Sequence, residues 1–309
     1  MPVPNCLRGS ALLWRFGQTV RLEVRDEVGG DDARGPWSGA GDSVEHSEQH
    51  DQGIVGIGND RPAAAVERLR PAMIGLNPHH HNPTGTRLSA ARRRAVADVA
   101  ADYGVPLVED RVAAELAFDG VVPPPLAVHR PDGAFVTVDS FSKLAWGGLR
   151  IGWVRADAGT IQLLRTSKAL ADLWSPIPSQ VLALTVIDHL DELTRERIAR
   201  LRTSERLLAD ELARHLPDWK VARVRGGMVA WARLPSGSAA AFCRFATRFG
   251  VAIAGGREFS TSTVVDDHVR IPFTRPDQTV SDAVERLAAA WAAFPPARLD
   301  DPMPATSIV

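Results

Sequence analysis

The sequence Ser-Phe-Ser-Lys at Ser140–Lys143 is followed by Gly-Gly-Leu-Arg-Ile-Gly at Gly147–Gly152. One lysine therefore stands beside two hydroxyl side chains, and Arg150 lies seven residues beyond it. Hydroxyls and a guanidinium can hold a phosphate group, and a lysine amine can form a Schiff base with an aldehyde. A lone lysine after a strand is usually a solvated surface residue. This neighbourhood instead favours a ligand with both a phosphate and an aldehyde, which is the chemistry of pyridoxal phosphate (PLP).

Three apolar runs precede polar residues in a repeated pattern. The runs are Pro71–Asn77, Val105–Val108 and Ala134–Val138, and the polar residues after them are Asn82, Asp110 and Lys143. A helix capped by Ser89 and ending at Gly104 is predicted between the first two runs. Strand, helix and strand with short connections predict a mostly parallel sheet covered by helices. Ligands of such sheets bind at the carboxyl ends of the strands, so we expect the three polar residues to share one site.

Asp110 and Asn82 each have a structural and a chemical interpretation. An aspartate at a strand end is often only a helix cap, and Asn-Pro-Thr-Gly at Asn82–Gly85 is also an ordinary turn sequence. In a PLP site, a buried carboxylate must face the pyridine nitrogen and keep it protonated. An asparagine amide at the end of the neighbouring strand could donate to the ring oxygen.

Bulk properties restrict the classes of partner. The chain has 309 residues, 45% of them apolar, and a formal net charge of −1, which gives no reason to expect nucleic acid or a membrane as partner. Cys6 and Cys243 are the only cysteines, which excludes a disulfide framework and fits a reducing cytoplasm. No apolar run approaches the roughly 20 residues of a membrane helix. The run His79–His81 predicts no metal site, because adjacent side chains point in different directions.

Composition and pattern divide the chain into four segments. Residues 1–52 are predicted to form an irregular acidic arm with one strand near Thr19–Val24. Residues 53–175 are predicted to form a PLP-binding large domain, and 176–295 a linking helix with a small α+β domain. Residues 296–309 are predicted to form a loose Pro-rich tail.

The second half of the chain is predicted to alternate between long helices and short strands. The expected helices are Gly159–Trp174, Ser179–Leu216, Ser238–Phe249 and Pro276–Phe294, and the expected strands are Trp219–Val224, Met228–Leu234, Val251–Ala254 and Val269–Phe273. Arg270 lies within the last strand, where a guanidinium needs an anionic partner. That partner is either a carboxylate on a neighbouring strand or a ligand.

Together these features resemble the class I/II aminotransferases of PLP fold type I. The nearest branches are the aminoadipate/kynurenine-type enzymes and the aminotransferase-like domain of MocR-type regulators. The resemblance runs from about Arg70 to Leu287. It rests on these pieces in order: Asn82–Gly85, Glu109-Asp110 before Glu115-Leu116, Ser140–Trp153, Gly226-Gly227-Met228 with Trp231, and Arg270.

The resemblance implies a role for each site residue. Lys143 would form the internal aldimine with PLP, and Asp110 would pair with the pyridine nitrogen; these are the implied catalytic residues. Asn82 would contact the ring oxygen. The phosphate would be held by Ser140, Ser142 and Arg150. Arg270 would bind the substrate carboxylate.

The resemblance also implies an activity and an assembly. The activity is the transfer of an amino group between an amino acid and a 2-oxo acid, by a homodimer with PLP as cofactor. The implied fold is α/β, a fold-type-I large domain with a smaller α+β C-terminal domain.

The sequence departs from the family pattern in two places. The family has a tyrosine after the acidic pair, and the corresponding residue here is Val112. The first half of the large domain has no recognisable counterpart in residues 1–52, so the large domain is predicted to be incomplete. These departures leave two alternatives to an active enzyme. One is a non-catalytic domain that senses PLP or an amino acid, related to the MocR-type regulators. The other is a degenerate, truncated paralogue.

Overall fold

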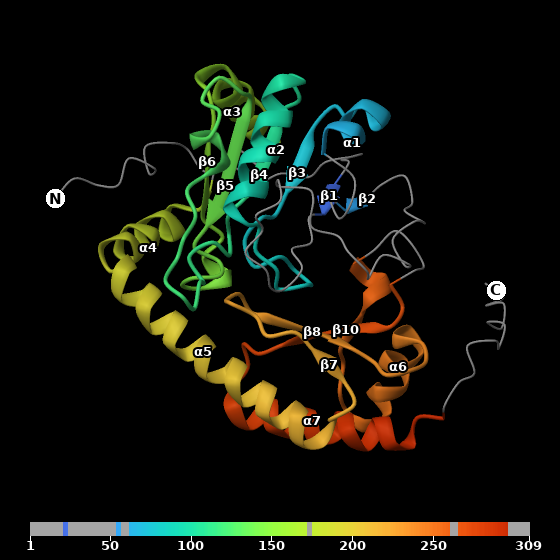
Figure 1. The fold of residues 1–309 in the computed structure, drawn as a ribbon. Coiled ribbons are helices and arrows are strands. Elements are labelled where there is room, and N and C mark those ends of the chain that lie inside the picture. Colours follow the sequence, from blue (N-terminus) through green and yellow to red (C-terminus); the bar gives the residue numbers. More distant parts are fainter. Residues whose placement is uncertain (1–20, 24–53, 57–61, 172–174, 260–264, 296–309) are drawn as a thin grey trace. The chain divides into compact units, whose positions relative to one another are not determined.

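The computed structural model describes residues 21–23, 54–56, 62–171, 175–259 and 265–295 (Figure 1). The chain divides into two compact units, Met1–Arg202 with Val224–Gly227, and Thr203–Arg223 with Met228–Val309. Apart from one short strand, the predicted acidic arm lies outside the described residues, as does the predicted tail.

The first unit is built on a six-stranded sheet in the order β2-β1-β3-β4-β5-β6. The strands are β1 (Arg21–Glu23), β2 (Ile54–Gly56), β3 (Ile74–Leu76), β4 (Leu107–Asp110), β5 (Phe135–Ser140) and β6 (Gly152–Arg155). The pairings from β2 to β5 are parallel, whereas β6 returns antiparallel to β5. The predicted mostly parallel sheet of an α/β fold is therefore confirmed, with an antiparallel edge strand that the sequence pattern did not indicate.

Two helices cover one face of this sheet. They are α1 (Pro62–Leu69) and α2 (Ala90–Asp102), which bury apolar side chains against β3, β4 and β5. The predicted capping of α2 is confirmed, because Ser89 Oγ accepts a hydrogen bond from the backbone N–H of Arg92 at 3.3 Å. Gly104 follows the helix at φ +63°, a conformation that suits glycine. A short 3₁₀ turn, η2 (Leu126–Val128), contributes Leu126 to the same core.

The predicted single helix Ser179–Leu216 is wrong, because the structure has two helices there. After α3 (Ala158–Ala171), the chain forms α4 (Ile177–Asp188) and α5 (Leu190–His215). His189 lies between them with φ −116° and ψ 17°, which is outside the helical range, and its Nδ1 lies 3.0 Å from the carbonyl oxygen of Thr185. Helix α4 also begins earlier than expected, because Pro178 lies in the first turn, where a missing N–H does no harm.

The second unit is a small α+β domain, as predicted, and its sheet is antiparallel. Its strands, in the order β7-β8-β10-β9, are β7 (Lys220–Val221), β8 (Val229–Arg233), β10 (His268–Pro272) and β9 (Ala254–Gly255). Its helices after α5 are α6 (Ala239–Ala246) and α7 (Asp277–Ala293), with the short 3₁₀ turns η4 (Thr247–Phe249) and η5 (Gly256–Phe259). Aromatic rings of Trp219, Phe242 and Trp291 pack edge to face in its core. Among the described helices, none is long and apolar enough to cross a membrane.

Candidate active site

The connection between β5 and β6 carries the lysine and the three residues predicted to hold a phosphate. Strand β5 ends at Ser140, and the chain turns through Ser142 and Lys143 into the 3₁₀ turn η3 (Gly147–Leu149). Arg150 follows in the left-handed conformation at φ 55°, and β6 then pairs back onto β5. The backbone N–H of Ser142 donates to Ser140 Oγ at 3.3 Å. Both Lys143 and Arg150 are exposed, so this one connection presents an amine, a guanidinium and two hydroxyls.

Buried apolar side chains anchor the connection between β5 and β6. Phe141, Leu149 and Ile151 are buried in one cluster with Ala183 of α4. The rings of Phe141 and Trp153 pack with centroids 4.8 Å apart. The polar side chains of the connection therefore alternate with anchored apolar ones. This arrangement holds the backbone of the turn in place while leaving the polar groups at its surface.

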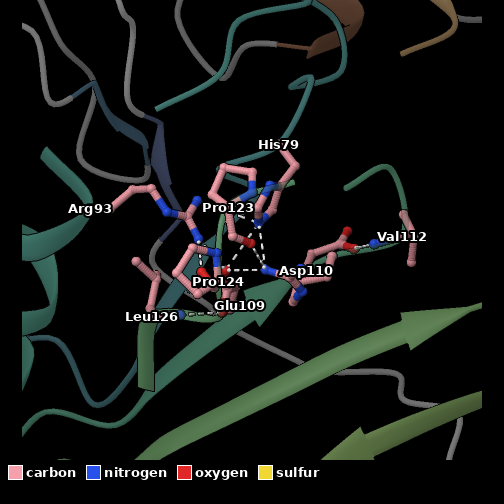
Figure 2. A network of polar contacts seen from close by, with 9 residues as sticks. His79, Arg93, Glu109, Asp110, Val112, Pro123, Pro124 and Leu126 are labelled. Atoms are coloured by element: carbon pink, nitrogen blue, oxygen red, sulfur yellow. Dashed lines mark hydrogen bonds and ion pairs between the residues drawn. The ribbon is translucent and has the colours of Figure 1, made fainter. Parts of the chain in front are cut away.

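Asp110 lies at the carboxyl end of β4, the strand next to β5. The two strands pair with Asp110 opposite Val138, and the backbone N–H of Arg111 donates to the Val138 carbonyl at 2.8 Å. Asp110 Oδ1 accepts from the backbone N–H of Val112 at 3.0 Å (Figure 2). Val112, where the resemblance predicts a tyrosine, thus supplies Asp110 with a backbone donor.

Asn82 lies in the turn that follows β3. The turn is closed by two backbone hydrogen bonds, from His81 N–H to the Thr86 carbonyl at 2.7 Å and from Gly85 N–H to the His81 carbonyl at 2.6 Å. The peptide bond between Asn82 and Pro83 is cis. Asn82 itself is exposed. Because β3, β4 and β5 are neighbours in the sheet, Asn82, Asp110 and Lys143 all lie at or after the carboxyl ends of adjacent strands.

Arg270 belongs to the second unit. It lies in β10, the strand between β8 and β9, opposite Trp231 on one side and Ala254 on the other. Its guanidinium carbon lies 4.8 Å from the centroid of the Phe259 ring, which is a cation–π contact. Its proposed role toward a substrate carboxylate stays a prediction.

The three consecutive histidines point to three different neighbours. Nε2 of His79 lies 3.1 Å from Glu109 Oε1, and Nδ1 of His81 lies 2.9 Å from Thr84 Oγ1. His80 has φ +46°, and its ring is buried against Gly226 and Gly227. Burial lowers the pKa of both His79 and His80 to about 4, so both are neutral at pH 7. Among the described residues, no group of three or more histidine, cysteine or acidic side chains could hold a metal ion.

Sequence reasoning missed a buried ionic cluster between β4 and α2. Glu109 and Arg93 are both almost completely buried, and Arg93 NH2 donates to Glu109 Oε1 at 3.0 Å. The apolar periodicity of the helix could have indicated that Arg93 is buried. Arg93 shares the buried face of α2 with Val96, Ala97 and Ala100, at spacings of three, four and seven residues. An arginine on the apolar stripe of a helix needs an acidic partner in the core.

A second residue that sequence reasoning missed is Asp139, directly before Ser140. Its Oδ1 accepts from the Ser140 backbone N–H at 2.7 Å. Burial raises the pKa of Asp139 to about 7, and this rise is opposed by the Ser140 hydrogen bond and by the charge of Arg111. The sequence feature that could have indicated this residue is a carboxylate at the end of an apolar strand, beside the predicted phosphate site.

The donor set of the first unit fits PLP. An exposed amine can react with an aldehyde, and hydroxyls with a guanidinium on the same turn can hold a phosphate. A carboxylate and an amide at the ends of the two neighbouring strands match a pyridinium nitrogen and a ring oxygen. Lys143 is one of three lysines in the chain, with Lys168 and Lys220, so a Schiff-base amine is scarce in this sequence.

The chain belongs to the class I and II aminotransferases, because the sequence pattern of that family matches residues 73–287. The fold is that of the fold-type-I enzymes of this family. The family and the donor set together indicate pyridoxal 5′-phosphate as the cofactor.

Individual relatives resemble the chain over most of its length. Aromatic-amino-acid aminotransferase 1 of Thermococcus litoralis is 29% identical over 216 residues, which cover 68% of this chain and 52% of that protein. The crystal structure of LysN, an α-aminoadipate aminotransferase of Thermus thermophilus complexed with N-(5′-phosphopyridoxyl)-L-leucine, matches with a TM-score of 0.71 at 24% identity. That match covers 78% of this chain and 65% of LysN.

A regulator also appears among the relatives. The HTH-type transcriptional regulator YdfD of Bacillus subtilis, itself uncharacterized, is 30% identical over 171 residues, which cover 53% of this chain and 35% of that protein. The predicted resemblance to both enzymes and regulators is therefore confirmed. The chain spans only about half the length of the curated aminotransferases that it matches.

Proposed function

We propose that this protein is a PLP-dependent aminotransferase that moves an amino group between an amino acid and a 2-oxo acid. The observation that carries the proposal is the placement of Asn82, Asp110 and Lys143 at or after the carboxyl ends of the adjacent parallel strands β3, β4 and β5. Ligands of parallel sheets bind at this edge. The family membership of residues 73–287 supports the same reaction class.

Each residue has a proposed task. The amine of Lys143 would condense with the aldehyde of the cofactor with loss of water, and, once displaced by the substrate amine, it would take the proton that leaves the substrate α-carbon. Asp110 holds a proton on the pyridine nitrogen. Bound PLP supplies an electron sink for the negative charge that develops at that α-carbon.

The remaining residues bind and orient. The amide of Asn82 donates to the ring oxygen. The hydroxyls of Ser140 and Ser142 and the guanidinium of Arg150 would hold the phosphate, and the guanidinium can bind it through two parallel N–H groups. We assign the substrate carboxylate to Arg270, on the basis of the family resemblance.

The test uses the scarcity of lysine in this chain. The purified protein is incubated with PLP, reduced with borohydride and digested, and the pyridoxyl group is located by mass spectrometry. We expect the adduct on Lys143, its loss in Lys143→Ala, and its retention in the matched control Lys220→Ala. Labelling spread equally over the three lysines, or none in folded protein, would reject the proposal.

A non-catalytic sensing domain is the second candidate, and the similarity to YdfD favours it. It predicts a pyridoxyl adduct on Lys143 together with no 2-oxo acid formed from any proteinogenic amino acid. Formation of a 2-oxo acid that depends on Lys143 would exclude it. A degenerate paralogue predicts neither adduct nor product.

We also propose that the protein forms a homodimer through α4. This helix has no charged residue before Asp188, and within it Ala183 alone is buried. Ile177, Val181 and Leu184 are each more than half exposed, and an apolar patch of this kind on a soluble protein usually marks an interface. Sedimentation should show a dimer that Leu184→Glu dissociates. A wild-type monomer would contradict the proposal. A cytoplasmic location stays a prediction from the cysteine content.

A further inference from the structure

A buried carboxylate, that of Glu109, gathers donors from four separate segments of the first unit (Figure 2). Its Oε1 lies 3.1 Å from His79 Nε2 and accepts from Arg93 NH2 at 3.0 Å and Arg111 NH1 at 3.5 Å. Its Oε2 accepts from the backbone N–H of Leu126 at 2.8 Å. The side chains of His79, Arg93 and Glu109 are all at most 2% exposed, so water does not compete for these contacts.

The two arginines extend the cluster to the loop before η2. Arg93 NH2 donates to the carbonyl of Pro124 at 2.7 Å, and Arg111 NH1 donates to the carbonyl of Pro123 at 3.0 Å. Because Leu126 also donates to Glu109, this loop is attached to the cluster at three points. The cluster therefore connects the turn after β3, helix α2, the end of β4 and the loop 123–126.

The charges of the cluster do not balance by themselves. Burial would raise the pKa of Glu109, but the hydrogen bonds from His79 and Leu126 and the charge of Arg93 outweigh burial, so that pKa lies below its usual value. Burial keeps His79 neutral at pH 7. Two guanidiniums thus face one carboxylate. Buried ion clusters rarely add stability over apolar packing of the same volume. The more direct effect of this cluster is therefore to fix the positions of the segments that it joins.

The cluster lies next to two of the proposed cofactor contacts. Glu109 and Asp110 are consecutive in β4, so their side chains point to opposite faces of the strand. The contacts of the Glu109 carboxylate on one face of β4 therefore fix the backbone that sets the direction of the Asp110 side chain on the other face. His79 lies three residues before Asn82, in the same turn. Holding His79 against β4 fixes where that turn begins.

We propose that Glu109 is a positioning residue, which through His79 holds the strand ends that carry Asn82 and Asp110 in register for the ring of the cofactor. The assignment of that ring rests on the proposed function. The holding of the two strand ends does not, and it can be measured without cofactor.

The first measurement is hydrogen exchange, followed by mass spectrometry, on the protein without PLP. In Glu109→Gln the amide must present its NH₂ group to at least one of the donors around it, so a contact is lost. We expect amides in 79–86 and 110–112 to exchange about tenfold faster or more, as befits the loss of a buried hydrogen bond, with no change at 229–233 in the second unit. Glu211→Gln, which removes another buried glutamate paired with an arginine, should leave both segments unchanged.

A second variant covers the case in which Glu109→Gln does not fold. His79→Leu removes a neutral ring and leaves Glu109 with both arginines. It should speed exchange in 79–86 while 110–112 stays protected. Unchanged exchange in 79–86 in every folded variant would overturn the proposal.

The second measurement tests whether Glu109 affects the affinity for PLP and the absorbance of bound PLP. PLP is titrated into wild type and variants well below their melting temperatures, and the absorbance of the bound cofactor is followed against pH. Positioning predicts that Glu109→Gln weakens PLP binding about tenfold and moves the pH midpoint of the spectrum. A purely structural role lowers the melting temperature and leaves that midpoint unchanged, which would overturn the claim. If wild type gives no adduct on Lys143, the proposed function fails, while the exchange data still decide whether Glu109 holds the strand ends.

Discussion

Asp139 is the residue whose ionisation should respond most visibly to pH. Its carboxyl is half-buried at the end of β5 and accepts from Ser140 N–H. Burial raises its pKa to about 7, with Asp110 and Glu115 adding to the rise and Arg111 opposing it. The folded protein therefore holds a proton at pH values where the unfolded chain has lost it.

The sign of the resulting effect is opposite to that of most carboxylates. Between the unfolded pKa near 3.8 and the folded value near 7, the native state binds more protons, so the free energy of unfolding falls as pH rises. Asp139→Asn should be neutral at pH 4 and should stabilise the protein by roughly 1–3 kcal/mol at pH 8, a reduced figure because the carboxyl is only half-buried. Urea denaturation at both pH values measures this. Equal stabilisation at pH 4 and pH 8 would contradict it.

His79 and His80 should produce the reverse pH dependence. Burial lowers the pKa of each to about 4, from 6.5 in the unfolded chain. Between these values the unfolded chain binds more protons, so stability falls as the solution is acidified from pH 7 toward pH 4. Together the two histidines contribute a slope of up to about 2.7 kcal/mol per pH unit.

One substitution isolates the contribution of His80. Its φ of +46° is left-handed, and asparagine tolerates that conformation better than most residues. His80→Asn should therefore reduce the pH slope between pH 6 and pH 5 by about one proton. The slope comes from denaturation curves at closely spaced pH values, and His129→Asn serves as the control, because His129 is only partly buried. An unchanged slope would mean that His80 is protonated in the folded protein.

At the scale of elements, the sequence predicts most helices and strands, and the misses have physical causes. The cap at Ser89 and the strands before Asp110 and Lys143 depend on local patterns, so they could be predicted. The break at His189 could not, because α4 and α5 are both helical in sequence and their separation depends on which faces each one buries. The reversal of β6 also depends on the turn at Arg150, whose left-handed φ of 55° no local preference indicates.

Gly152 is where the β5–β6 pairing depends most closely on one residue. A Cβ atom there would lie 2.7 Å from the carbonyl oxygen of Asp139, which is backbone and cannot rotate away. Gly152→Ala should destabilise the first unit by about 1–3 kcal/mol and weaken PLP binding, because β5, which ends at Ser140, and β6, which follows Arg150, must separate. Gly147→Ala is the matched control, since the nearest atom to its Cβ would lie at 3.7 Å. Equal melting temperatures for the two variants would contradict this account of the pairing.

At the scale of the whole molecule, the residues singled out from the sequence are unevenly divided between the two units. Six of the seven residues singled out from the sequence lie in the first unit, and Arg270 lies in the second. Motif order is enough to propose all seven, because each motif is local. The partners of Glu109 could not be identified in this way: His79, Arg93 and Leu126 come from three segments that only the folded sheet brings together.

PLP should stabilise the whole protein by an amount that reports which groups hold it. A ligand that binds only the folded state adds about 2.7 kcal/mol at a concentration one hundred times its dissociation constant. The melting temperature of the wild type should therefore rise with PLP concentration. Lys143→Arg keeps the positive charge but removes the amine that reacts with an aldehyde, so PLP should raise the melting temperature of this variant less than that of the wild type.

Pyridoxal, which lacks the phosphate, should stabilise the wild type less than PLP does, because Ser140, Ser142 and Arg150 then have no anion to bind. Equal stabilisation of wild type and Lys143→Arg by PLP would show that the phosphate is held without the lysine, and Lys143 would then have no part in binding.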